Sequence, residues 1–106
     1  MNWLKNFFGI FPTFGGVPRS SRWGSARKEH LRLNPICAVC NGKNDLDVHH
    51  IQVYNLHPEL ELTPSNLLTL CTPHHILFGH LMNYQSYNSN VVEDAKYFHA
   101  KILSRP

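Results

Sequence analysis

The spacing of hydrophobic residues predicts short strands and helices joined by many turns. Residues 46–53 form a run rich in β-branched residues, which predicts a strand. Residues 67–70, Leu-Leu-Thr-Leu, form a short apolar run and predict a second strand. Apolar residues three to five positions apart predict a helix over 74–84, and apolar residues on one face predict a last helix over 91–103. Together these elements indicate a small α+β domain.

The ends of the predicted helices follow from polar residues and prolines. A first helix is expected to begin directly after Ser25, whose hydroxyl can cap it. It should end at Asn34, because the proline that follows disfavours helical geometry in the residue before it. Ser89 or Asn90 can cap the last helix. Proline and glycine in residues 1–18 interrupt regular structure, which predicts a flexible N-terminal arm.

The length of 106 residues fits a single domain, predicted over residues 19–106. A chain of this size buries only about two-thirds of its unfolded surface, so a metal site would add useful stability. The net charge of +3 permits a polyanionic partner but does not demonstrate one.

No run of about 18 apolar residues occurs, so no membrane span is expected.

Basic residues gather in residues 19–33, around Trp23. In most proteins such a stretch is a solvated helix face. The sharper interpretation is contact with the phosphates of DNA, with little sequence preference, because nothing in the chain suggests an element that reads bases. The residues predicted to make these contacts are Arg22, Arg27, Lys28 and Arg32.

The three cysteines have the spacing of a zinc site. Cys37 and Cys40 form a C-x-x-C pair, and Cys71 is followed three residues later by His74. Two short chelating turns can supply the four tetrahedral ligands of a structural Zn²⁺. The alternative is three ordinary buried cysteines, and the neighbouring His75 could replace His74 as the fourth ligand. An odd number of cysteines argues against a disulfide framework and for a reducing, intracellular (cytoplasmic) setting.

The chain contains 8 histidines, and some of them form a second pattern. His49 and His50 are adjacent on the predicted strand, Asn66 follows a loop, and His75 begins the next helix. This order resembles the HNH endonucleases, over about residues 22–84, and small bacteriophage members with a zinc site are the most similar. The segments that carry the resemblance are Leu46-Asp47-Val48-His49-His50-Ile51, Ser65-Asn66-Leu67-Leu68-Thr69-Leu70-Cys71 and His74-His75.

The resemblance implies a ββα-metal (His-Me finger) fold and hydrolysis of phosphodiester bonds in DNA. His50 would be the general base, while His49 and His75 would bind a single catalytic metal ion. Asn66 would hold the loop and orient His50 through a carbonyl contact. The catalytic metal could be Mg²⁺, Mn²⁺, Ni²⁺ or Zn²⁺. The setting would be a phage-infected bacterium, with a packaging protein or another protein as a possible partner and the oligomeric state left open.

Two residues near this pattern are doubtful members of the metal site. Many family members carry a further ligand four residues after the helix histidine, where this chain has Gly79. His80 comes one residue later, and on an α-helix it would point well away from His75, so it is a doubtful ligand. Structural packing or contact with a phosphate is about as good an interpretation of His80. Asp47 could support the site through a ligand, but a solvent-facing strand position is the expected one.

Two other functions compete with the nuclease. One is a non-catalytic zinc-knuckle module that binds nucleic acid or protein, and the other is a structural phage component that uses zinc only to fold. All three predict zinc and a basic face. Only a nuclease needs an adjacent histidine pair aligned with a helix histidine, which favours the enzyme.

Overall fold

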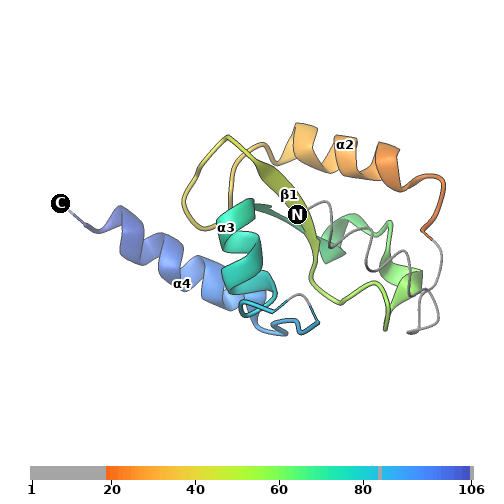
Figure 1. The fold of residues 1–106 in the computed structure, drawn as a ribbon. Helices are drawn as coiled ribbons and strands as arrows, with labels where there is room; N and C mark the ends of the chain where they lie inside the picture. The colour runs from red at the N-terminus through yellow and green to blue at the C-terminus, as the bar shows by residue number, and fades with distance from the viewer. Residues whose placement is uncertain (1–18, 84, 106) are drawn as a thin grey trace.

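The computed structural model describes residues 19–83 and 85–105, so the predicted arm over residues 1–18 and Tyr84 lie outside the described residues. The described part is an α+β fold with a two-stranded antiparallel sheet, as predicted (Figure 1). Its elements are α2 (Trp23–Leu33), β1 (Leu46–His50), η1 (Pro58–Leu60), η2 (Pro64–Asn66), β2 (Leu67–Cys71), α3 (Thr72–His74), η3 (His75–Gly79) and α4 (Val91–Leu103).

The hairpin of β1 and β2 carries residues of both predicted metal sites. Its register pairs Leu46 with Cys71 at one end and His50 with Leu67 at the other. The prediction that β1 continues to residue 53 is wrong. The short 3-10 helix η2 precedes Leu67, so no extended partner lies beside the chain after His50.

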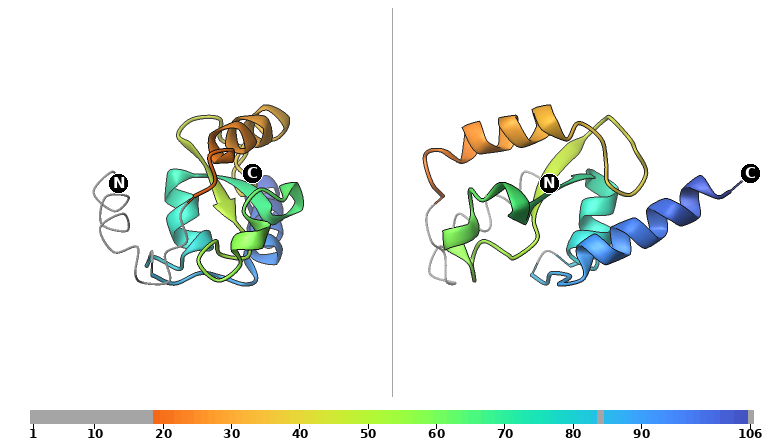
Figure 2. Two further views of the ribbon diagram at one scale, coloured as in Figure 1. Left: turned by 90° about the vertical axis from the view of Figure 1, so that its right-hand side faces the viewer. Right: turned by 180° about the vertical axis from the view of Figure 1, so that it is seen from behind.

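Helix α2 lies along one side of the hairpin, and α3, η3 and α4 lie on the other (Figures 1 and 2). The helix begins at Trp23, so the prediction that Ser25 caps its start is wrong, and Arg22 at the capping position makes no side-chain cap. Contact between Trp23 and His50, whose ring centroids lie 4.6 Å apart, joins this first turn to β1. The helix ends at Leu33 with Asn34 as its C-cap, as the following proline predicts.

The helix predicted over residues 74–84 is much shorter. One α-helical turn, α3, passes directly into the π-helical turn η3, which ends at Gly79. Leu81 and Met82 then adopt positive φ angles of 53° and 68°. Since a left-handed backbone cannot continue a right-handed helix, the helix stops before these residues.

Helix α4 has the predicted bounds, Val91–Leu103. Asn90 occupies its N-cap position but makes no capping bond with its side chain, so neither predicted cap operates. Instead, the backbone N–H of Asn90 donates to Asn88 Oδ1 at 3.0 Å, and Asn88 Nδ2 donates to Asp94 Oδ2 at 2.7 Å. This asparagine joins the loop to the first turn of α4.

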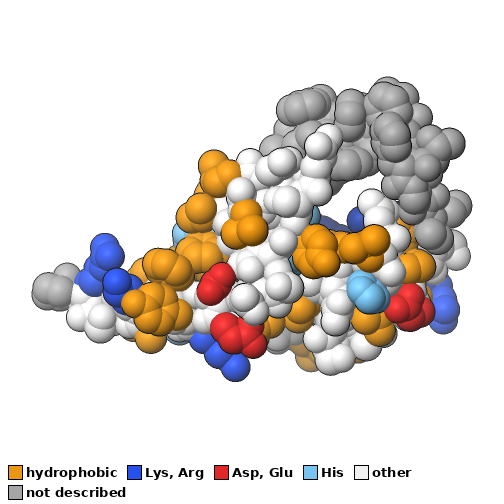
Figure 3. All heavy atoms as spheres, turned by 90° about the horizontal axis from the view of Figure 1, so that it is seen from below, with side chains coloured by type: hydrophobic (Ala, Val, Ile, Leu, Met, Phe, Trp, Pro, Cys, Tyr) orange, Lys and Arg blue, Asp and Glu red, His pale blue; other side chains and the backbone are white. Residues whose placement is uncertain are grey.

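The hydrophobic core is small and lies beside the cysteines. Its buried members are Cys37, Val39, Leu70, Phe78, Val91 and Ala95. On α4, the hydrophobic side chains of Phe98 and Ile102 remain 40% and 39% exposed. Tyr97 and Leu103 of the same helix are exposed as well. Hydrophobic side chains also gather near the C-terminal end of the face shown in Figure 3. Among the described residues, no helix has the length and apolar character needed to cross a membrane.

Candidate metal centres

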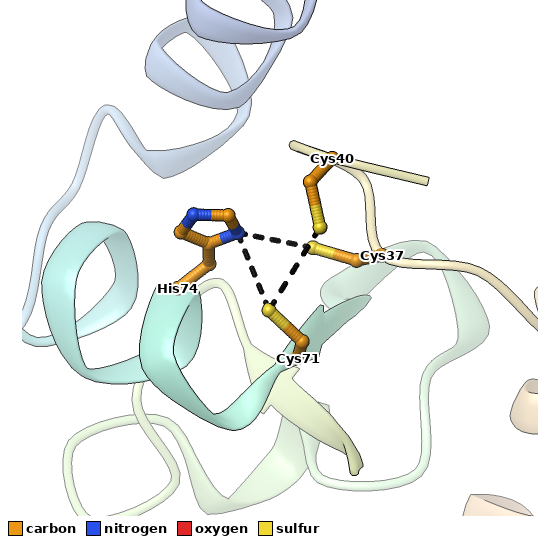
Figure 4. Close-up of side chains that lie close together, drawn as sticks. All are labelled: Cys37, Cys40, Cys71 and His74. Atoms are coloured by element: carbon orange, nitrogen blue, oxygen red, sulfur yellow. Dashed lines mark hydrogen bonds between the residues drawn. The ribbon is translucent and has the colours of Figure 1, made fainter. Parts of the chain in front are cut away.

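The first cluster brings together the cysteine pairs predicted from spacing. Cys37 and Cys40 come from the loop before β1, Cys71 ends β2, and His74 lies on α3 (Figure 4). Their side chains point toward one another, and their ligand atoms all lie within 4.8 Å of one another. All three cysteines are free thiols rather than disulfides.

Distances within this cluster fit a tetrahedral zinc site. His74 Nδ1 lies 3.3 Å from Cys71 Sγ and 3.6 Å from Cys37 Sγ, and the sulfurs of Cys40 and Cys71 are 4.0 Å apart. Zinc bonds of ordinary length place sulfur and nitrogen ligands about 3.5 to 3.8 Å apart. The four residues could therefore hold a metal ion such as a structural zinc.

The ionisation of the thiols also favours a cation. Burial raises the pKa of Cys37, but hydrogen bonds to its sulfur outweigh burial and bring the pKa to about 6. For Cys71, burial and then the negative charge of Cys37 raise the pKa to about 11. The negative charge of the Cys37 thiolate thus disfavours ionisation of Cys71. A divalent cation removes this conflict, because it stabilises all the thiolates together.

The second cluster consists of three histidines. His49 lies on β1, His75 begins η3, and His80 follows its last residue. His75 Nε2 is 3.1 Å from His49 Nδ1 and 3.1 Å from His80 Nε2. Three imidazole nitrogens bound to one zinc-sized ion would lie about 3.3 Å apart. This geometry fits a metal site with histidine ligands.

Neighbouring acceptors fix the proton positions in two of these histidines. Asp47 Oδ2 lies 3.0 Å from His75 Nδ1, and the Ser86 carbonyl lies 2.8 Å from His80 Nδ1. Because a carboxylate and a carbonyl only accept, each Nδ1 carries the hydrogen and each Nε2 turns a lone pair toward the cluster. Metal-binding histidines commonly have this kind of partner. The expectation that Asp47 faces only solvent is wrong.

His49 is the most enclosed member of the cluster, with 2% of its surface exposed. Burial, and then the neighbouring charges of His75, His80 and His50, lower its pKa to about 3. Burial also lowers the pKa of His80. Neutral imidazole is the form that binds a metal. These two residues are therefore suited to act as ligands at neutral pH.

The π-helical turn explains why His80 reaches the cluster. An α-helix would turn a side chain five residues after His75 away from it, but the hydrogen bonds of a π turn join residues five positions apart and so bring His80 back toward His75. The expectation that His80 points away is wrong for this reason. Gly79 supplies the space, since a Cβ there would lie 3.0 Å from His49 Nδ1 and 3.1 Å from His75 Cδ2.

His50 lies on the strand next to His49 but in different surroundings. Its Nε2 is 2.9 Å from the backbone carbonyl of Glu61, and its ring contacts Trp23. Because the carbonyl only accepts, Nε2 carries the hydrogen and Nδ1 carries the basic lone pair. Burial lowers the pKa of His50, so it is neutral near pH 7 and can accept a proton.

Asn66 fastens the loop that carries Glu61. Its Oδ1 accepts from the N–H of Gln52 at 2.8 Å, while its Nδ2 donates to the carbonyls of Gln52 at 3.1 Å and Leu60 at 3.3 Å. Leu60 is the residue before Glu61. Asn66 therefore acts on His50 indirectly, by holding the segment whose carbonyl receives the hydrogen of His50.

The four basic residues predicted to bind DNA differ in their surroundings. Arg22 and Lys28 are exposed. Arg32 donates to Glu29 through Nε at 3.0 Å and through Nη2 at 2.6 Å. Arg27 donates to the carbonyl of Leu46 at 3.4 Å, which links α2 to β1. Two of the four side chains are thus already held by the protein.

Comparisons of the chain with models of protein families, with curated proteins and with solved structures find no match.

Proposed function

We propose that this protein is a metal-dependent DNA endonuclease of the HNH type. The observation that supports it most is the cluster of three histidines, one of which, His49, precedes His50 on β1. His49, His75 and His80 offer nitrogens within 4.8 Å of one another. Metal-dependent hydrolysis of a phosphodiester uses a cation on the phosphate and a group that takes a proton from the attacking water. The cluster suits the first need and His50 suits the second.

In this proposal His49, His75 and His80 hold the catalytic ion. Asp47 and the Ser86 carbonyl keep the rings of His75 and His80 in the orientation that ligation needs. When bound, the metal would polarise the scissile phosphate and stabilise the charge on the leaving oxygen. Mg²⁺, Mn²⁺, Ni²⁺ and Zn²⁺ remain the candidate ions, with three histidine ligands favouring the transition metals.

The general base in this proposal is Nδ1 of His50. Its opposite nitrogen donates to Glu61, so the lone pair on Nδ1 is kept for the proton of water. Asn66 keeps the loop of Glu61 in place and so orients the base. The Cys37, Cys40, Cys71 and His74 site contributes stability, because it fastens the loop before β1 to the end of β2.

Cleavage of supercoiled plasmid tests the proposal. The zinc-loaded protein is incubated with each of the four metals, beside a His50→Ala variant. We expect nicking by the wild type and a loss of roughly 100-fold or more in the variant, the size typical of a general base. His57→Ala is the matched control, because His57 lies in the loop after β1 and its side chain pairs with the exposed Glu59.

Circular dichroism and zinc analysis check that each variant is folded and keeps its zinc. If the folded wild type cuts with none of these metals, the nuclease proposal is wrong and a nucleic-acid- or protein-binding zinc module becomes the better explanation. Equal cleavage by wild type and His50→Ala would remove His50 from the mechanism.

A further inference from the structure

Arg19, which precedes α2, lies over two aromatic rings near His50. Its guanidinium carbon is 4.5 Å from the centre of the Tyr54 ring and 5.1 Å from that of Trp23. The ring centroids of Trp23 and His50 are 4.6 Å apart. Trp23 therefore contacts both the guanidinium and the ring of the proposed base. Stacking of this kind holds the flat guanidinium in one orientation.

Glu61 joins Arg19 to His50. Its carboxylate accepts from the backbone N–H of Ser20 at 3.1 and 3.3 Å and lies 3.9 Å from Arg19 Nη1. Its backbone carbonyl receives the Nε2 hydrogen of His50. Glu61 is 5% exposed. One buried residue thus fixes the position of the arginine through its side chain and the position of the base through its backbone.

The guanidinium is still able to bind a ligand. The 3.9 Å separation from Glu61 is an ion pair but is longer than a hydrogen bond. The side chain of Arg19 is 49% exposed, so part of it faces solvent. Arg32 differs, because two short hydrogen bonds to Glu29 already occupy its guanidinium.

From this arrangement we infer that Arg19 binds a backbone phosphate of the DNA strand that is cut, next to His50, and that Glu61 positions it. The inference rests on the proposed nuclease function. A guanidinium presents paired N–H donors that match the oxygens of a phosphate. A flat group held against Trp23 and Tyr54 loses little further freedom on binding. Arg22 and Lys28 are exposed instead.

Binding without cleavage is the first test. The full zinc-loaded chain, with no further metal added, is titrated with a fluorescent DNA duplex over a series of salt concentrations, and a gel confirms that the DNA stays intact. For Arg19→Gln we expect about 10-fold weaker binding and a salt slope reduced by about 1, as for the loss of one phosphate contact. Arg105→Gln, which removes an arginine near the C-terminal end beyond α4, should change neither value.

Cleavage is the second test. Under metal-supported conditions we expect Arg19→Gln to lower kcat/KM by about 10- to 100-fold, the range for a lost charge-assisted hydrogen bond. Arg19→Lys keeps the charge and the pairing with Glu61 but lacks the fork of donors. It should bind and cleave at a level between those of the wild type and Arg19→Gln. It also serves as the test variant should Arg19→Gln fail to fold.

The outcomes separate this inference from the nuclease proposal. If the wild type cleaves and folded Arg19→Gln keeps wild-type binding, salt slope and kcat/KM, the inference is overturned while the nuclease stands. If no metal supports cleavage but Arg19→Gln still loses DNA affinity and salt slope, Arg19 binds phosphate in a protein that is not a nuclease. Wild-type behaviour of Arg19→Lys would overturn the fork of hydrogen bonds as the mode of binding.

Discussion

Two neighbouring histidines on one helical turn belong to two different clusters. His74 Nδ1 lies 3.3 Å from the sulfur of Cys71, whereas His75 Nε2 lies 3.1 Å from His49 Nδ1. The helix that starts at the end of β2 thus has a cysteine cluster on one side and a histidine cluster on the other. Consecutive helical residues point about 100° apart, which makes this division possible.

The difference in ligands suggests a difference in role. Three thiols and one imidazole make a complete tetrahedral set for zinc, with no position left for water or substrate. Three imidazoles leave at least one position open, as catalytic zinc sites do. The proposed base follows His49 directly on β1, and Trp23 contacts both this base and an exposed arginine. The cysteine cluster instead adjoins the hydrophobic core.

The largest expected effect appears when the loss of one cysteine ligand is compared with the loss of one histidine ligand. The two losses should differ in their effect on folding. Cys37→Ser should abolish cooperative folding, because structural zinc contributes on the order of 10 kcal/mol in small modules. His75→Ala should leave the fold and the first zinc in place but remove binding of the second metal. Thermal unfolding by circular dichroism and metal analysis by mass spectrometry measure both effects.

Comparable stability of the two variants would contradict a division into a structural and a catalytic site. Chelation gives an independent check on the same point. Removing zinc from the wild type should unfold it, and adding zinc back should restore both the fold and cleavage.

A smaller but more selective effect is expected at Gly79. In Gly79→Ala the new Cβ would meet His49 at 3.0 Å and should displace the histidine ligands. We expect binding of the second metal to weaken by at least about 10-fold, as for other disturbed metal surroundings, while the cysteine site keeps its zinc. Isothermal titration calorimetry with the metal measures the affinity of the histidine site.

Gly24→Ala is the matched control for the same chemical change. Nothing lies within 4 Å of a Cβ at Gly24, which is inside α2. This substitution should raise the free energy of unfolding by about 0.5 to 1 kcal/mol. Unchanged metal binding in Gly79→Ala would show that the histidines can move apart without loss of the site.

The smallest expected effect comes from Asp47→Asn. The amide keeps an oxygen near His75 Nδ1 but removes the negative charge that orients and polarises the ring. A partner of this kind typically changes metal affinity by about 10- to 100-fold, and we expect the low end because the oxygen is kept. Metal titration of the folded variant is the measurement, and an affinity equal to that of the wild type would mean that Asp47 does not tune the ligand.

The sequence by itself determined the features that depend on local spacing. The C-x-x-C and C-x-x-H pairs predict the cysteine cluster, since each pair of ligands sits on one short turn. Alternation along β1 predicts that Asp47 and His49 share one face and that His50 takes the other. The two strands and the last helix also follow from hydrophobic spacing.

Only the tertiary structure decided which other groups meet at the histidine cluster. A π turn between His75 and Gly79 brings His80 to His75, where an α-helical repeat predicts that it points away. Arg19 is brought near His50 by Glu61, which is 42 residues further along the chain. An argument from periodicity holds for a regular helix and relates only residues that are close in the sequence. The π turn η3 sets the position of His80, and the long loop after β1 sets the position of Arg19 through Glu61, so no local pattern could reveal either.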